Sequence, residues 1–136
     1  MVATISVVIK DNQLPRLMAA APNKADAALR VLANEGLNKA KLLIHESPAT
    51  GITYTRGTIQ HTASSPGNAP RSDTGTLINS LNVQPAGTLR YEISDGVEYG
   101  VMLEFGTDNI EPRPFMGPMA MWLEGEVSDV FDKFLE

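Results

Sequence analysis

The sequence contains no cysteine, which excludes disulfide bonds, thiol nucleophiles and thiolate metal ligands. It contains only two histidines, His45 and His61, and neither lies in a spacing typical of a zinc site. No apolar run approaches the roughly 20 residues that a membrane helix needs, and the N-terminus lacks the pattern of a secretion signal. We therefore expect a protein made in a reducing cytoplasm, with no metal, no other cofactor and no membrane partner.

Sequence motifs of catalysis are also missing. The serines at 64 and 65 lack the strand–turn–helix setting of a nucleophile elbow. The glycines at 51 and 57 are not followed by a phosphate-loop lysine. We expect that the protein is not an enzyme.

The charge is distributed unevenly along the 136 residues, whose length predicts a single domain, 1–136. The net charge of the whole chain is −5, but residues 91–136 alone contain eleven acidic and two basic residues, a net −9. The acidic segment 91–136 argues against binding to DNA phosphates. It suits a partner with a basic surface or a lumen that repels DNA, although simple solvation of a helix face explains it equally well.

Two long helices and several short strands are expected from the spacing of apolar residues. Residues 24–46 and 118–135 have helical spacing, with Asn23 a candidate N-cap and Gly36 a point of close approach. Residues 76–81 predict a helical turn. Alternating segments predict strands over 4–10, 82–84, 89–94 and 99–105.

Together these elements predict an α+β fold. An antiparallel three- to four-stranded sheet would be packed by a long N-terminal helix and a C-terminal helix.

Residues 47–75 form a long loop insertion rich in glycine, proline, serine and threonine. A structureless loop of this length is uncommon in a compact domain. Two interpretations remain open: a disordered insertion without a role, or a flexible assembly arm that becomes ordered on a neighbouring subunit. We expect residues 51–68 to be dispensable for folding. The candidate arm residues are Ile52, Tyr54, Arg56, Ile59 and Arg71, of which the three apolar ones could form a short ribbon.

The run 99–118, YGVMLEFGTDNIEPRPFMGP, carries the other candidate residues. Glu104 is an exposed strand carboxylate, a partner of Arg113, or an acceptor for backbone N–H groups around Gly106 and Thr107. Arg113 could equally face a neighbouring subunit. The prolines at 112 and 114 stiffen the chain and should deliver Phe115 to the core, and Pro118 suits the first turn of a helix.

These motifs resemble a family of small neck and tail-completion proteins of long-tailed bacteriophages, which includes head–tail joining proteins and relatives of minor tail protein Z. YGVMLEFGT resembles the family's strand ending in E-x-G-T, here Glu104, Gly106 and Thr107. PRPFMGPMA resembles its R-P-F-hydrophobic-x-P-A segment, here Arg113, Pro114, Phe115 and Pro118, although Met119 separates the last proline from alanine. DTGTLINS at 73–80 resembles its D-T-G-x-L-x-x-S motif.

The resemblance implies a structural virion protein that completes the tail and joins head to tail. Its partners would be other phage neck or tail proteins. It would form a homo-oligomeric ring in the particle and let DNA pass through the lumen without specific binding. The entropy cost of ordering the arm predicts that the free protein is largely monomeric. It would reside in the virion and, during assembly, in the host cytoplasm. The alternative is a small nucleic-acid-binding or regulatory protein that uses the loop 47–75, although its few cations make a weak nucleic-acid signal.

Overall fold

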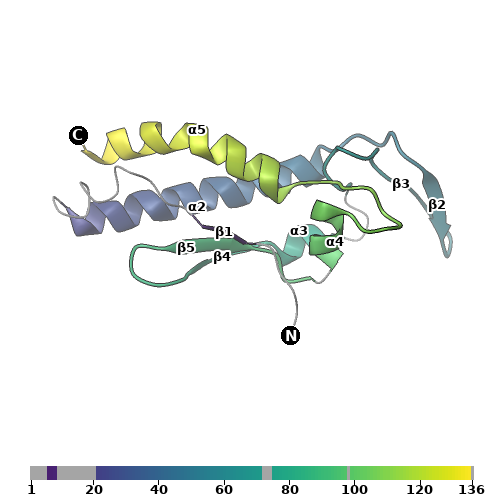
Figure 1. Ribbon diagram of the computed structural model, residues 1–136, viewed down its shortest axis with the longest axis horizontal. Helices are drawn as coiled ribbons and strands as arrows, with labels where there is room; N and C mark the ends of the chain where they lie inside the picture. The colour runs from purple at the N-terminus through teal and green to yellow at the C-terminus, as the bar shows by residue number, and fades with distance from the viewer. Residues whose placement is uncertain (1–5, 9–20, 72–74, 98, 136) are drawn as a thin grey trace.

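The structure is a computed structural model that describes residues 6–8, 21–71, 75–97 and 99–135. Figure 1 shows α2 and α5 side by side along the long axis, the sheet beside α2, and the ribbon β2–β3 extending from one end. The elements in chain order are β1 (Ser6–Val8), α2 (Pro22–His45), β2 (Thr53–Arg56), β3 (Ile59–Thr62), α3 (Thr76–Ser80), β4 (Asn82–Pro85), β5 (Tyr91–Ser94), α4 (Tyr99–Phe105) and α5 (Met116–Leu135).

The α+β class and both long helices are confirmed. The helical turn expected over 76–81 is α3. The main sheet has three antiparallel strands in the order β1-β5-β4, with Ile93 of β5 opposite Val7 and Val83. Strand β5 begins only at Tyr91, because Leu89 has a φ of 50° and cannot continue an extended strand. Of the strand expected over 4–10, residues 6–8 are observed and the others lie outside the described residues.

Helix α2 begins differently from the expectation. Its N-cap is Ala21, no side chain caps it, and Asn23 lies inside the helix. The predicted capping role of Asn23 is therefore wrong. Pro22 in the first turn supplies the helical φ and has no N–H that would need a partner.

Gly36 marks the point where α2 approaches both neighbours, as expected. A Cβ atom there would lie 2.6 Å from Cδ1 of Ile93 and 3.0 Å from Cδ2 of Leu123. The absence of a side chain therefore lets α2 approach β5 and α5 together.

The segment 99–105 is a helix, α4, and the predicted fourth strand is wrong. Its alternation of apolar residues fits a strand, but four-residue spacing places Gly100 and Glu104 on one helix face, and both are buried. The large side chain of Phe105 is 69% exposed instead of packed in a sheet. Burial of the Glu104 carboxylate thus decides the conformation of this short segment.

The glycine that was expected to end a strand ends this helix. Gly106 has a φ of 77° and donates its N–H to the carbonyl of Met102 at 2.8 Å. This is the left-handed C-terminal cap that glycine adopts with little strain. A Cβ atom at Gly106 would also lie 2.7 Å from the carbonyl oxygen of Ile110, so the following turn needs glycine for a second reason.

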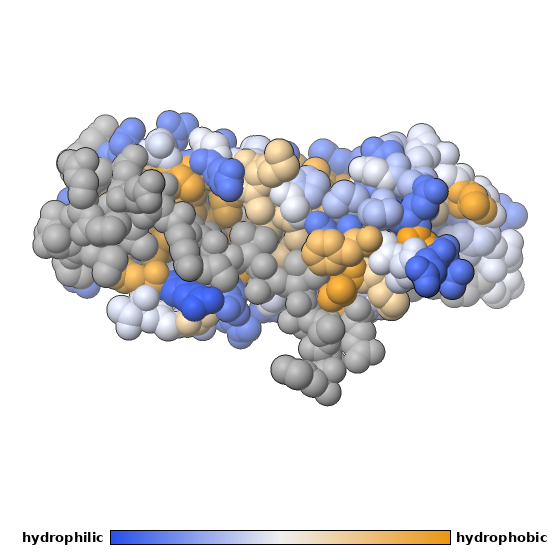
Figure 2. Space-filling model, viewed as in Figure 1, coloured by the Kyte–Doolittle hydropathy of each residue, from blue (hydrophilic) through white to orange (hydrophobic). Residues whose placement is uncertain are grey.

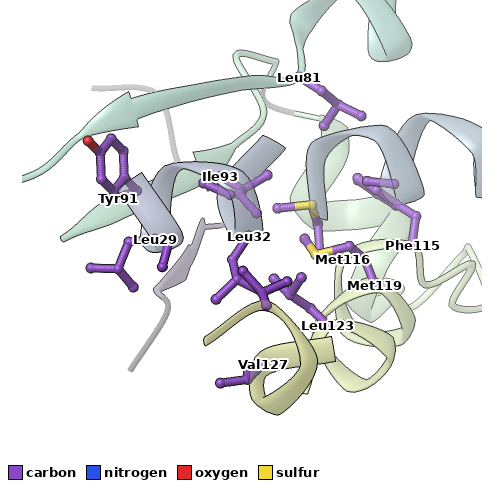
Figure 3. Close-up of a cluster of buried hydrophobic side chains, with 14 of the residues drawn as sticks. Leu29, Leu32, Leu81, Tyr91, Ile93, Phe115, Met116, Met119, Leu123 and Val127 are labelled. Carbon is purple, nitrogen blue, oxygen red and sulfur yellow. The ribbon is translucent and has the colours of Figure 1, made fainter. Parts of the chain in front are cut away.

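One apolar cluster from both long helices, α3, the sheet and the segment before α5 makes the core. Figure 3 shows Leu29 and Tyr91 at one end of this cluster and Phe115 with Met116 at the other. Phe115 is completely buried, which confirms that the proline-rich segment delivers it to the core.

Replacing Phe115 by alanine should lower the free energy of unfolding by about 3–5 kcal/mol, because the change leaves a cavity in a closed core. Phe105→Ala is the matched control, since it removes the same atoms from an exposed site and should cost about 0.5 kcal/mol or less. Urea denaturation followed by circular dichroism measures both. Equal effects of the two substitutions would contradict the assignment of Phe115 to the core.

Candidate functional site

The carboxylate of Glu104 caps the N-terminus of α5. Its Oε2 accepts the backbone N–H groups of Phe115 at 2.7 Å and Met116 at 2.9 Å, and its Oε1 accepts that of Gly117 at 2.8 Å. These are three of the four N–H positions that a helix leaves unpaired at its start, and the fourth residue, Pro118, has no N–H. Every backbone donor of the first turn is therefore satisfied by one side chain.

This cap is also electrostatically favourable. The N-terminus of a helix carries partial positive charge, and α5 has no acidic residue in its own first turn. Glu104 is only 7% exposed, so the charge is compensated in a buried setting by three charge-assisted hydrogen bonds. Gly117 leaves room for the carboxylate, because a Cβ atom there would lie 3.1 Å from Oε1.

The sequence interpretation of Glu104 is thus partly wrong. Backbone N–H groups do hold the carboxylate, but they belong to the start of α5 and not to Gly106 and Thr107. Thr107 instead closes a tight turn, in which its hydroxyl oxygen accepts the N–H groups of Asn109 and Ile110. The proposed pairing of Glu104 with Arg113 is not formed.

Arg113 connects the crossover, residues 106–115, to the arm. Its Nε and Nη2 donate to the carbonyl oxygen of Ser64 at 3.2 and 3.1 Å, and its backbone N–H donates to the carbonyl of Leu103 at 2.6 Å. The side chain and the main chain of one residue thus join the arm, the crossover and α4. The flanking prolines, Pro112 and Pro114, fix the backbone that aims this side chain.

The base of the arm is part of the fold. Ser64 is completely buried, Gly67 donates its N–H to the carbonyl of Pro112 at 2.9 Å, and the hydroxyl of Ser47 donates to the carbonyl of Ala69. A Cβ atom at Gly51 would lie 2.4 Å from the carbonyl oxygen of Ser64, so the two sides of the base are in close contact. A deletion of residues 51–68 would therefore remove contacts of the crossover, and only the outer part of the arm projects freely.

This outer part is the ribbon β2–β3, which fits the short ribbon suggested by the sequence. The strands pair in register from Thr53 opposite Thr62 to Arg56 opposite Ile59. Ile52 and Ile59 are 79% and 58% exposed. Two large apolar side chains at the end of the molecule have no partner within the described chain that covers them.

A hollow of about 540 Å³ lies between the ribbon base, α3, α4 and the crossover. Its apolar walls come from Ile44, Leu77, Leu103 and Ile110. Its polar side is aromatic and basic, and none of its described lining residues is acidic. The polar lining residues include Tyr54, His61, Arg71, Tyr99 and Arg113.

Hydrogen bonds and ring contacts hold these polar side chains in place. The Nη1 of Arg71 donates to the carbonyl oxygen of Thr62 at 2.9 Å. The rings of Tyr54 and His61 pack with their centroids 5.3 Å apart. Burial raises the pKa of Tyr99 despite its hydrogen bond with Thr76, so this phenol stays neutral at physiological pH.

Asp95 is a buried carboxylate that the sequence interpretation missed, because Asp95-Gly96 is also a strong tight-turn signal. It is 2% exposed, and neither of its carboxylate oxygens has a hydrogen bond of good geometry among the described residues. Burial raises its pKa, the nearby charge of Glu104 adds to this effect, and the backbone of Val97 offsets it in part. A Cβ atom at Gly100 would lie 1.9 Å from Oδ2 of Asp95, so α4 needs glycine there.

The residues that carry the sequence resemblance thus gather at one place. Glu104, Gly106 and Thr107 lie at the end of α4, and Arg113, Pro114, Phe115 and Pro118 lie in the crossover and the first turn of α5. Within the described ranges, no group of three acidic or histidine side chains could hold a metal ion, and no helix is long and apolar enough to cross a membrane. Comparisons with family models, curated proteins and solved structures found no match to this chain.

Glu104→Gln should lower the free energy of unfolding by about 2 kcal/mol, because an amide offers one acceptor where the carboxylate offers two charged ones. The control is Glu124→Gln, the same change on the exposed side of α5, which should have an effect of about 0.5 kcal/mol or less. Urea denaturation at neutral pH gives both values. A Glu104→Gln variant as stable as the control would rule out a stabilising cap.

Asp95→Asn should raise the melting temperature at neutral pH, and the gain should shrink as the pH falls towards about 4. An acid whose pKa is raised by folding binds its proton more tightly in the folded state. It therefore stabilises the fold most at low pH, and this contribution is lost as the pH rises through the raised value.

Thermal denaturation of both proteins between about pH 4 and pH 8 measures this difference. Asp129→Asn, on an exposed part of α5, is the control and should show no such trend. A loss of stability of Asp95→Asn that is equal at every pH would mean that the carboxylate makes an essential hydrogen bond.

Proposed function

We propose that this chain is a structural protein of a long-tailed bacteriophage or prophage particle, which completes the tail and joins it to the head. The observation that supports this most is the spatial grouping of the motif residues. Glu104 and Arg113 come from the two segments that resemble the neck and tail-completion proteins, and together they tie the start of α5 and the arm base to one crossover.

This grouping gives the motif residues an architectural role. A buried carboxylate whose oxygens accept three backbone N–H groups has little acceptor capacity left for a substrate. Arg113 uses its Nε and Nη2 on a backbone carbonyl. Such contacts hold a projecting ribbon at a fixed angle to the two long helices, which is what a protein that works by assembly requires.

The ribbon is the proposed assembly element. Its exposed apolar residues lie beyond the core, and its base is fixed by Ser64 and Gly67. A pre-positioned ribbon loses less conformational entropy on docking than a disordered arm would. The saving is about 1–2 kcal/mol for each residue that is already ordered before docking. The partner is another protein of the neck or tail, and the particle would contain the chain as a ring.

The test is removal of the ribbon alone in the phage or prophage that encodes the chain. Deleting 53–56 and 59–62 leaves Gly57 and Thr58 as the turn between Ile52 and Ala63, which already pair through the N–H of Ala63 and the carbonyl of Ile52 at 2.9 Å. Four residues are lost from each strand, so the alternation of hydrogen bonds is kept. The variant should melt within a few degrees of the natural protein, and unjoined heads and tails should accumulate.

The control is Val31→Thr, a change of an exposed apolar residue on α2 that should leave particles intact. Purified particles should contain the natural chain at a fixed copy number, as judged by quantitative mass spectrometry. Absence of the chain from particles, or normal assembly without the ribbon, would contradict the proposal. Binding of the purified protein to DNA that is lost with Arg56→Ala would instead support the nucleic-acid-binding alternative.

A further inference from the structure

The outward side of α5 and the end of the molecule that carries the ribbon differ in charge and in exposed apolar side chains. Figure 1 shows that α5 runs away from the ribbon, so its C-terminal half lies at the opposite end of the long axis. The outward side of α5 exposes one apolar residue in the N-terminal half of the helix, followed by acidic residues that continue into its C-terminal half. We call this the α5 face, and it consists of Met121, Glu124, Ser128, Asp129 and Asp132.

The end that carries the ribbon has basic side chains in its hollow, whereas the crossover beside it also exposes Asp108 and Glu111. Arg71 and Arg113 line the hollow, and no described carboxylate lies within ion-pairing distance of the Arg113 guanidinium. Figure 2 shows an apolar patch over α4, where Met102 and Phe105 are 43% and 69% exposed. We call this end the ribbon face, which consists of the hollow together with the exposed side chains of α4.

We propose that the α5 face of one copy of this chain docks on the ribbon face of the next copy. Met121 is 76% exposed and is the long, flexible apolar side chain that an irregular apolar hollow accommodates. Glu124 lies three residues further on, so it shares the helix side of Met121 and reaches the rim when the methionine enters. Arg71 on that rim supplies the opposite charge.

The chemistry of the two faces favours a second copy over other occupants. The acidic α5 face repels nucleic acid, whose phosphates would need cations that this face lacks. Each face matches the other in both charge and apolar content, so one chain carries both halves of the contact. Because the two faces are different surfaces, the contact is heterologous and generates a ring if its rotation closes. This inference rests on the proposed function, since it specifies the contact within the ring.

The chain has no cysteine, which makes directed cross-linking unambiguous. Phe105→Cys marks the ribbon face and Ser128→Cys marks the α5 face while leaving Met121 in place, and both positions are exposed. In particles assembled with the double variant, a bis-maleimide cross-linker should give a ladder of covalent oligomers. In particles assembled with a mixture of the two single variants, it should give dimers only. Val31→Cys combined with Ser128→Cys is the control pair and should give no ladder.

Charge reversal tests the same contact at other residues. Arg71→Glu or Glu124→Arg alone should lower the cross-linking yield at least about tenfold, since like charges would then face each other. The two reversals together should restore the yield. Lys24→Glu makes the same charge change on an exposed residue at the start of α2 and should have no effect.

The outcomes separate this inference from the proposed function. Particles that contain the chain but give only cross-links between two copies of position 105, or between two copies of position 128, would overturn the head-to-tail contact. A yield no higher than that of the control pair would also overturn it. In both cases the virion role would stand, whereas absence of the chain from particles would refute that role directly.

Discussion

The burial of one carboxylate, that of Glu104, determines how the second half of this chain is arranged. A charge removed from water must be compensated, and three backbone N–H groups at the start of α5 do so. This requirement turns 99–105 into a helix, sets the distance between α4 and α5, and fixes both ends of the crossover. The backbone of Phe115 supplies one of those three N–H groups, and its side chain lies in the core.

The long elements were predictable from the sequence because their patterns are local. Helical spacing over 24–46 and 118–135 identifies α2 and α5, and short alternating segments identify the strands of the sheet. The short segment 99–105 was not predictable in this way, because seven residues fit either period and the deciding contact is made with a different element. Gly106 fitted both interpretations, as a strand end and as a helix cap.

In the candidate site, too, features set by local geometry were predictable and contacts between distant elements were not. The two prolines correctly predicted a stiff crossover and the burial of Phe115, since both follow from local geometry. The partner of Arg113 lies 49 residues away at Ser64, and no local pattern links the two. The burial of the Asp95 carboxylate was not predictable, because Asp-Gly is used in tight turns regardless of whether the carboxylate becomes buried.

The attachment of the ribbon base has a mechanical consequence. Ser64 and Gly67 are bonded to Arg113 and Pro112, which directly precede the capped end of α5. A tensile load on the ribbon therefore reaches α2 through the covalent linker 46–52, and the crossover passes part of it to α5, which packs on α2. The prolines resist stretching of this short path, because their fixed φ angles leave little slack in the backbone. Force applied to the ribbon is thus transmitted to both long helices, and the ribbon does not move independently of them.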